Sequence, residues 1–510
     1  VVSEILPGAY NCLYIGSLKG GVKELNLTSG KLRDLLLKDE DNESIYCRTL
    51  LFATDNELWI GTESGAYIYN LRTGKYTHLR SSEYDPYSLS DNAIYSFCKD
   101  REDGIWIGSY FGGVNYYPRS YTHFEKYYPK GEENSLHGKR VREFCRDNYG
   151  VLWIGTEDGG LNRFNLNTKE FSFFAPSAGF TNIHGLCLVD DKLWVGTFSK
   201  GLKIIDTRTG TVLKTYQKNS SPRSLIDNSI FAICRTATGD IYLGTMFGLV
   251  KYNKQSDDFD RIPELNGKFV YDIKEDSGGN IWLATYANGA YCYNVNDRKW
   301  KNYVHDEKDT TSLSYNKVSS IFEDSYHRIW LTTQGGGFCL FHPESETFTS
   351  YNSTDGLPSD VVYQIVEDKD GQLWLTTNNG LVYFQPKTET MKVYTTANGL
   401  LGDQFNYRSS FEDENGMIYF GGIDGFIAFN PKSFSENKNL PTVVITDFLL
   451  FNKEVYADEP NSPLEKNITF SDKIVLRADQ NSFSFRISAL GYQAPGMNKL
   501  MYKLEGFDNE

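Results

Sequence analysis

One short pattern, an apolar residue, then Trp or Tyr, then a second apolar residue, usually followed by Gly-Thr or Thr-Thr, recurs ten times in this 510-residue chain. Seven of the eight tryptophans occupy its aromatic position. These ten aromatic anchors are Tyr14, Trp59, Trp106, Trp153, Trp194, Tyr242, Trp282, Trp330, Trp374 and Tyr419. Successive anchors lie about 45 residues apart, and such a period with several short strands per unit predicts a β-propeller, in which each repeat is one four-stranded blade.

The repeat between Val361 and Tyr394 shows the four strands of a blade. We predict strands at residues 361–366, 373–377, 381–384 and 391–394, separated by turns rich in Gly, Asn and Asp. The second strand is apolar on both faces, which indicates blades packed face to face. Glycine recurs in the second turn of almost every repeat, and a tight turn with positive φ explains it without a ligand. The sequence therefore predicts an all-β protein.

Charge and composition exclude several functional classes. The net charge of −14 argues against nucleic-acid binding, because neutralising phosphates requires a basic face. The best apolar stretch, Val443–Phe451, is too short to span a membrane. The eight cysteines have no C-x-x-C spacing and the seven histidines form no H-E-x-x-H motif. We therefore expect no metal site and no cofactor.

The cysteines and histidines are both expected to be structural. Cys98, Cys145, Cys187 and Cys234 lie seven or eight residues before an anchor, so they are predicted to be small buried side chains on neighbouring inner strands. The histidines are scattered without a recurrent partner. We expect them in turns or at the surface.

The last 70 or so residues follow a different pattern. After Pro441 the aromatic repeat stops, and Ser482–Ser488 alternates between polar and apolar residues. Alternation of this kind suits a small antiparallel sandwich. The tail is therefore predicted to be a second kind of domain.

Several motifs resemble those of one known family. They are Leu152–Thr156 with Gly159–Asn165, the Ser-Leu-x-x-Asn segments at Ser88, Ser224 and Ser312, Gly402–Tyr407, Phe429–Pro431, Asn481–Phe485, Ala489–Tyr492 and Tyr502–Asp508. In these motifs the chain resembles the regulator-propeller repeats of the periplasmic sensor regions of bacterial hybrid two-component systems, the type with which gut bacteria detect glycan fragments. Its tail resembles the triple-tyrosine domain that follows those propellers. The resemblance covers essentially the whole chain.

The resemblance implies tandem seven-bladed β-propellers followed by an Ig-like β-sandwich, but ten anchors do not make two full propellers. Counting back seven anchors from Tyr419 reaches Trp153. We therefore predict the last blades of a first, incomplete propeller at residues 1–130, a complete second propeller at 131–436 and a partial triple-tyrosine sandwich at 437–510. The chain is expected to be a piece of a longer protein.

The same resemblance implies a function. This region is expected to be the periplasmic, non-enzymatic sensor of an inner-membrane histidine kinase. It would bind a glycan-derived oligosaccharide, act as a homodimer and make no direct contact with nucleic acid. The membrane-anchored full-length protein would then control polysaccharide-utilisation genes.

The candidate ligand site is the propeller face on which the loops entering each inner strand and the loops joining second and third strands meet. Aromatic rings there could stack on sugar, and polar groups could bond its hydroxyls. Paired guanidinium groups of Arg140 and Arg142 could hold a carboxylate or sulfate. The predicted ligand-binding residues are Tyr110, Phe111, Arg140, Arg142, Phe198, Tyr286, Gln404, Asn406, Tyr407 and Arg408, and the same rim includes Glu157, His184, Tyr271 and Tyr363. No catalytic residue is predicted.

These rim residues also permit purely structural roles. The rim aromatics could simply pack between blades, the arginines could form a solvated basic edge, and Gln404, Asn406 and Tyr407 could only shape the last blade. A propeller lyase or glycosidase is the alternative function, because a fold does not dictate function. A passive protein-interaction platform is a third, although the chain lacks the Gly-His and Trp-Asp marks of common scaffolding propellers.

Overall fold

The computed structural model describes residues 1–118, 124–131, 134–174, 181–434, 441–492 and 500–506. Their regular structure is almost entirely β-strand, which confirms the predicted all-β class. The short 3-10 helices in these residues are η1 (Pro263–Leu265), η2 (Ser353–Asp355), η3 (Thr396–Asn398), η4 (Pro431–Ser433) and η5 (Ile468–Phe470). No helix in the described ranges is long and apolar enough to cross a membrane. The chain divides into two compact units, 122–434 and 1–121 with 435–510.

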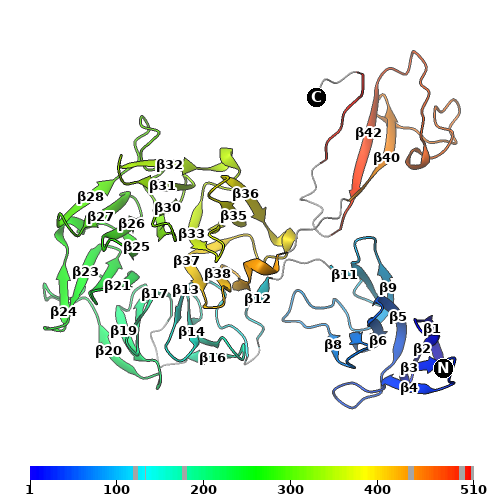
Figure 1. The fold of residues 1–510 in the computed structure, drawn as a ribbon, viewed down its shortest axis with the longest axis horizontal. Helices are drawn as coiled ribbons and strands as arrows, with labels where there is room; N and C mark the ends of the chain where they lie inside the picture. Colours follow the sequence, from blue (N-terminus) through cyan, green and yellow to red (C-terminus); the bar gives the residue numbers. More distant parts are fainter. Residues whose placement is uncertain (119–123, 132–133, 175–180, 435–440, 493–499, 507–510) are drawn as a thin grey trace. The chain divides into compact units, whose positions relative to one another are not determined.

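Seven antiparallel sheets stand around a common axis in the unit 122–434, as Figure 1 shows. Six of them run from inner to outer strand in chain order. They are β13–β16 (Val141–Arg146, Val151–Thr156, Gly160–Asn165, Phe171–Phe174), β17–β20 (Ile183–Val189, Lys192–Thr197, Leu202–Asp206, Val212–Tyr216), β21–β24 (Ile230–Arg235, Ile241–Thr245, Gly248–Asn253, Asp258–Arg261), β25–β28 (Val270–Glu275, Ile281–Thr285, Ala290–Asn294, Lys299–Tyr303), β29–β32 (Val318–Glu323, Ile329–Thr333, Phe338–His342, Thr347–Tyr351) and β33–β36 (Val362–Glu367, Leu373–Thr377, Leu381–Gln385, Thr390–Tyr394). The strands β33–β36 end within one residue of their predicted bounds.

The seventh sheet closes the ring. It contains β37 (Phe405–Glu412), β38 (Ile418–Gly422), β39 (Phe426–Phe429) and, as its outer strand, β12 (Glu125–Tyr127) from the start of the unit. Each inner strand contacts the next, and β37 contacts β13. The strand β12, which lies within the residues predicted to belong to the first propeller, thus contributes to this ring. Both ends of the unit share one sheet, so the ring is closed by strand pairing.

The other unit begins with three sheets. They are β1–β4 (Val2–Pro7, Cys12–Ser17, Gly21–Asn26, Leu32–Leu36), β5–β8 (Cys47–Thr54, Glu57–Thr62, Gly65–Asn70, Tyr76–Leu79) and β9–β11 (Ile94–Lys99, Ile105–Ser109, Val114–Tyr117). Their anchors are Tyr14, Trp59 and Trp106, in the second strand of each sheet. The β1–β4 and β5–β8 sheets have the same strand order as the blades of the other unit.

The tail forms a separate antiparallel sheet. In the described residues 441–492 and 500–506 its strand order is β41 (Lys453–Glu454), β40 (Thr442–Leu450), β42 (Phe483–Leu490). The motif residues Phe507 and Asp508 lie outside the described residues. The predicted triple-tyrosine assignment of this sheet stays a prediction.

A buried or half-buried aspartate ties the first turn of several blades to the aromatic anchor. In five blades the indole N–H of the tryptophan donates to the carboxylate of an aspartate six residues earlier, at distances of 2.8–3.1 Å. The same carboxylates also accept backbone N–H groups of the turn. These aspartates are Asp100, Asp147, Asp276, Asp324 and Asp368. The tryptophan therefore packs in the core and also binds the aspartate of the first turn, a contact that we call the aspartate–tryptophan clamp.

The recurrent threonine after the anchor closes the second turn. Its hydroxyl donates to the carbonyl of the turn glycine in seven blades, as in Thr333 to Gly337 at 2.9 Å. Gly337 has φ +72°, and a Cβ there would collide with the carbonyl oxygen of Tyr351. Glycine at this position is thus explained by backbone geometry.

The Ser-Leu-x-x-Asn segment fastens the crossover between blades. The side chains of Asn92, Asn228 and Asn316 each accept the backbone N–H of the second residue after an outer strand, at 2.7–2.8 Å. The leucines of these segments are buried. The motif therefore stabilises the connection into the next inner strand.

All eight cysteines are free thiols, and one of the four predicted to be buried is not. Cys145, Cys187 and Cys234 are partly buried, whereas Cys98 is exposed. Its strand β9 packs on β5 and β6, and within the described residues of its unit no further blade follows it. The prediction of burial fails at Cys98 because burial there requires a following blade.

Candidate functional site

Six inner strands of the ring carry a β-bulge immediately after their first residue. In β13, Val141 pairs with Thr156 and Glu143 with Gly155, so Arg142 is the extra residue. A bulge re-aims the side chain of its extra residue. The extra residues are Arg142, His184, Phe231, Tyr271, Ser319 and Tyr363. Each lies beside the turn between the second and third strands of its blade, so the six mark one end of the ring.

The seventh inner strand has a larger irregularity. In β37, Phe405 pairs with Gly422 and Ser410 with Phe420, so residues 406–409 face the single residue Gly421. Arg408 takes the left-handed conformation with φ +56°, which is uncommon for a residue other than glycine. The extra backbone brings Tyr407 and Arg408 to the ring axis.

Six aromatic rings form one connected group, which we call the mouth cluster: Phe198, Phe231, Phe269, Tyr271, Tyr286 and Tyr407. Ring centroids lie 4.4 Å apart for Phe231–Phe269, 5.4 Å for Phe269–Tyr286 and 5.2 Å for Tyr271–Tyr407. Phe231 and Tyr271 are buried, whereas Phe198 is 39% and Tyr286 42% exposed. The cluster thus presents accessible rings on a fixed aromatic base, as stacking against a flat apolar ligand face requires.

Arg142 lies under this cluster and is fully buried. Its guanidinium stands 3.2 Å from the ring centroid of Tyr407, and its Nη1 donates to the carbonyl of Tyr407. Its Nε donates to Nδ1 of His184 at 3.0 Å and lies 3.7 Å from the carboxylate of Glu157. Its Nη2 is buried with no hydrogen-bond partner among the described residues. Arg142 therefore contacts Tyr407, His184 and Glu157 at once, and its Nη2 stays available as a hydrogen-bond donor.

Arg408 spans the axis of the ring. Its guanidinium lies 3.4 Å from Glu143 of β13 and 3.3 Å from Asp272 of β25. Nη1 also donates to the carbonyls of Phe231 and Tyr271, at 3.3 and 3.2 Å. Its side chain is 11% exposed. One side chain from β37 thus bonds to three other inner strands and fills the axis beneath the mouth cluster.

Burial sets the protonation of two groups in this network. Burial raises the pKa of Glu143 to about 7, although Arg408 and Arg142 act in the opposite direction. Burial, together with repulsion from Arg142 and Arg408, lowers the pKa of His184 to about 2. His184 is therefore neutral, with Nδ1 accepting from Arg142 and Nε2 facing Oδ1 of Asn182 at 2.7 Å.

Replacing His184 with asparagine is expected to make the protein less sensitive to acid. Below an unfolded-state pKa near 6.5 the unfolded chain binds a proton that the folded chain does not, so His184 lowers stability as the pH falls. At pH 5 this contribution amounts to about 2 kcal/mol. Urea unfolding of wild type and variant at pH 7.5, 6 and 5 measures it.

The pH dependence of the variant has to be compared with that of wild type, because Glu143 changes the stability of both proteins in the opposite direction over the same pH range. Its raised pKa gives stability that is lost as the pH rises from about 4.5 to about 7. His327→Asn, at a histidine whose side chain is 72% exposed, is the matched control. An unchanged difference in unfolding free energy between wild type and His184→Asn from pH 7.5 to 5 would contradict the prediction.

The structure brings together half of the predicted site residues. Phe198, Tyr286 and Tyr407 belong to the mouth cluster, Arg142 lies beneath it, and Arg408 fills the axis below. Tyr110 and Phe111 belong to the other unit.

The remaining predicted residues lie outside the cluster. Asn406 is buried and accepts the backbone N–H of Tyr407, so it shapes the bulge. Arg140 and Gln404 lie outside the strands, before β13 and β37. The predicted pairing of Arg140 with Arg142 is wrong, because Arg140 precedes β13 and the bulge turns Arg142 inward. The expectation that histidines lie in turns or at the surface is also wrong for His184.

Four residues of the site were missed: Glu143, Phe231, Phe269 and Asp272. A signal for the bulge positions does exist in the sequence. Every extra residue of the six bulges lies ten or eleven residues before its aromatic anchor, and Arg408 lies eleven before Tyr419. The position four residues after the anchor holds Glu157, Phe198 and Tyr286. Alignment of the repeats on their anchors would have singled out both positions.

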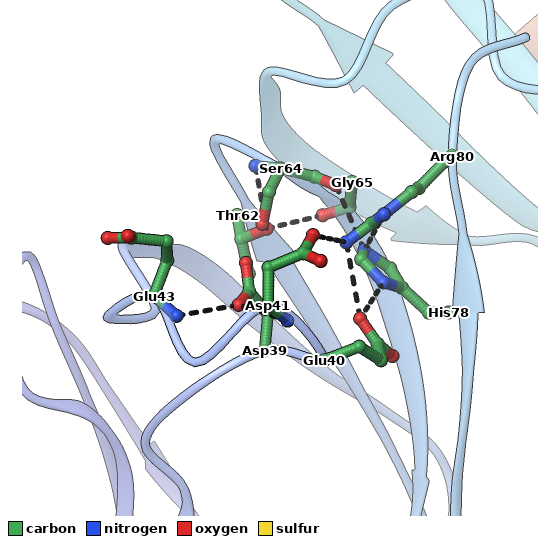
Figure 2. Close-up of polar contacts among 9 residues, drawn as sticks. All are labelled: Asp39, Glu40, Asp41, Glu43, Thr62, Ser64, Gly65, His78 and Arg80. Atoms are coloured by element: carbon green, nitrogen blue, oxygen red, sulfur yellow. Dashed lines mark hydrogen bonds and ion pairs between the residues drawn. The ribbon is translucent and has the colours of Figure 1, made fainter.

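A second polar cluster lies in the first unit, and Figure 2 shows it. Nδ1 of His78 lies 3.0 Å from Glu40, and its Nε2 lies 2.9 Å from the carbonyl of Ser64. The ring of His78 also stacks on that of Tyr67, with 3.8 Å between the ring centroids. Arg80 lies 3.2 Å from the same Glu40 carboxylate. These contacts fasten the acidic loop between β4 and β5 to the β7–β8 hairpin. The cluster is structural, and His78, with 8% of its side chain exposed, is a second histidine that is not a surface residue.

Comparisons with known proteins agree with this architecture. Residues 88–111, 135–158, 264–287, 312–335 and 356–379 match the family described as two component regulator propeller. A curated relative, histidine kinase P4 of Formosa agariphila, is 28% identical over 336 residues, which are 63% of this chain and 24% of the relative. The chain therefore spans about a quarter of the length of that relative.

Two solved structures share the fold. The extracellular domain of a hybrid two-component system from B. thetaiotaomicron is 21% identical with a TM-score of 0.53, covering 99% of this chain and 68% of that one. A structure described as the extracellular domain of a one-component system from the same organism has a TM-score of 0.52 at 21% identity, covering 100% and 75%. The matched segments confirm the predicted resemblance: the chain contains a β-propeller, and five of its repeats match the two component regulator propeller family.

Proposed function

We propose that this chain is the ligand-sensing region of a bacterial two-component sensor kinase and that the mouth cluster binds a ring of an oligosaccharide. The observation that supports this most is the combination of accessible rings at Phe198 and Tyr286 with the ion pair of Arg142 and Glu157. Sugars present an apolar face to aromatic rings and hydroxyls to charged acceptors. Lys317, 4.4 Å above the ring of Tyr286, adds a donor at the edge.

The site favours binding over hydrolysis. A glycosidase needs two carboxylates about 5–9 Å apart, both reaching the substrate. Glu143 and Asp272 are buried beneath the cluster and paired with Arg408. Neither is free to attack a sugar or protonate a leaving group. We therefore propose a non-enzymatic sensor and retain a lyase or glycosidase only as an outcome of the test.

Signalling requires that the ligand bind one arrangement of the protein better than another. We propose that the chain acts in the periplasm, as part of a membrane-anchored homodimer, and that ligand binding there regulates a cytoplasmic kinase. Control of polysaccharide-utilisation genes would follow from that kinase. The resemblance to hybrid two-component sensors supports this part of the proposal.

The test is calorimetric titration of the chain with five hexasaccharides: cellohexaose, xylohexaose, mannohexaose, arabinohexaose and hexagalacturonate. At least one is expected to bind, and Phe198→Ala and Tyr286→Ala are each expected to weaken binding about fivefold, since one stacked ring contributes about 1 kcal/mol. Tyr149→Ala, an exposed ring in the turn at the other end of a blade, is the control.

Reducing ends are measured in the same samples. Binding without new reducing ends supports the sensor. New reducing ends would favour the glycosidase instead. Binding that Phe198→Ala and Tyr286→Ala leave unchanged would remove the mouth cluster as the site.

A further inference from the structure

The first unit repeats the two positions that build the mouth cluster. Its inner strands β1, β5 and β9 carry bulges at the same place, with Ser3, Arg48 and Tyr95 as the extra residues. Each lies eleven residues before its aromatic anchor. Four residues after the anchors Trp59 and Trp106 stand Glu63 and Tyr110. The β-bulge that turns a side chain toward one end of the ring is therefore present in these blades too.

The side chains at these positions contact one another. Nε of Arg48 donates to the carboxylate of Glu63 at 2.5 Å, and the guanidinium of Arg48 lies 4.8 Å from the ring centroid of Tyr95. The hydroxyl of Tyr95 donates to the same Glu63 carboxylate at 3.4 Å. An arginine–glutamate pair is thus held against an aromatic ring.

Two further rings extend this group outward. The ring of Tyr110 lies 5.1 Å from that of Tyr95 and 4.4 Å from that of Phe111. Tyr110 is 60% exposed and Phe111 87% exposed. The backbone N–H of Phe111 donates to Asp91 at 2.9 Å, which fixes the turn that carries both rings. Two large apolar rings are therefore held in solvent on an anchored turn, an arrangement that costs hydrophobic free energy unless something covers them.

The arrangement corresponds to that of the mouth cluster, position by position. Arg48 and Glu63 occupy the positions of Arg142 and Glu157 in their blade, fifteen residues apart in both cases. In the following blade, Tyr95 occupies the position of His184, and Tyr110 that of Phe198. In both places the arginine pairs with the glutamate of its own blade. The same arginine also contacts the bulge residue of the next blade, His184 or Tyr95. The ring of that bulge residue in turn contacts the ring of Phe198 or Tyr110, which follows the second strand. Two blade pairs thus share one construction.

We propose that Arg48, Glu63, Tyr95, Tyr110 and Phe111 form a second oligosaccharide-binding site, separate from the mouth cluster. The ligand class rests on the proposed function of that cluster. A sugar ring stacks its apolar face on Tyr110 and Phe111, and its hydroxyls bond to the Glu63 carboxylate and to N–H groups of Arg48. Here the rings are more exposed than Phe198, so this site is the more open of the two.

The test uses the whole chain and the same five hexasaccharides. Titration calorimetry gives the number of equivalents bound by wild type, by Tyr110→Ala/Phe111→Ala and by Phe198→Ala/Tyr286→Ala. Wild type is expected to bind two equivalents, and each double variant one. Tyr10→Asn is the control, because Tyr10 is 93% exposed in the β1–β2 turn and has a positive φ that asparagine tolerates. Circular dichroism of each variant establishes that it is folded.

The outcomes separate this proposal from the function on which it rests. One equivalent that is lost only in Phe198→Ala/Tyr286→Ala would overturn the second site and leave the mouth cluster standing. One equivalent that is lost only in Tyr110→Ala/Phe111→Ala would support the second site and remove the mouth cluster. Absence of binding to all five hexasaccharides would overturn both.

Discussion

Arg408→Met is expected to lower the free energy of unfolding of the closed propeller by about 3–5 kcal/mol, because it leaves two buried carboxylates without their cation. Glu143 and Asp272 are each 7% exposed, and the guanidinium of Arg408 lies between them. Methionine keeps much of the side-chain volume, so the loss reports charge rather than a cavity. Against a typical stability of about 5–15 kcal/mol, this is a severe change. Urea unfolding followed by tryptophan fluorescence measures it.

The matched control removes the whole ionic group. In Arg408→Met/Glu143→Gln/Asp272→Asn no buried charge is left unpaired, so most of the lost stability should return. The backbone carbonyls of Phe231 and Tyr271 still lose their donor, which limits the recovery. A triple variant as unstable as Arg408→Met would show that the arginine acts through packing and not through these carboxylates.

Asp324→Ala is expected to destabilise the ring by a similar amount, about 3–5 kcal/mol. Its buried carboxylate accepts the backbone N–H groups of Tyr326 and Arg328, Nε of Arg328 at 2.7 Å and the indole N–H of Trp330 at 2.8 Å. Alanine would leave the buried indole N–H and the turn without an acceptor. Thermal and urea unfolding measure the loss, and the emission of Trp330, which is 1% exposed, should shift if its surroundings open.

Asp370→Ala is the control for this variant. Asp370 is an exposed aspartate in the corresponding turn of the next blade, two residues after Asp368, which holds Trp374. Its replacement should change stability by no more than about 0.5 kcal/mol. Equal losses in the two variants would mean that turn composition, and not the aspartate–tryptophan clamp, stabilises the blade.

The repeats made the blades predictable because their determinants are local. A strand with both faces apolar, a turn glycine and an aromatic anchor lie close together in the chain, and the strands β33–β36 accordingly match their predicted bounds closely. The role of the aspartate six residues before the tryptophan was not predicted. The recurrence of this aspartate is visible in the sequence, but an aspartate in a turn is normally expected to be solvated.

The candidate site was predictable only in part. Phe198 and Tyr286 follow the second strand directly, so the repeat itself places them on the rim. Arg140 and Arg142 were expected to face the same way, since alternate residues of a regular strand do. The bulge at Arg142 breaks that rule, and its side chain enters the ring.

The sequence by itself determined the all-β class, the blade period and the order of the blades, because each blade is specified by contacts between residues close in the chain. Only the tertiary structure decided which side chains meet at the axis. Arg142 bonds to Tyr407 across 265 residues, and Arg408 to Phe231 across 177. Such contacts form only once β12 pairs with β39 and closes the ring. The partners of a buried charge are therefore set by which residues the closed ring brings together, and not by their order in the chain.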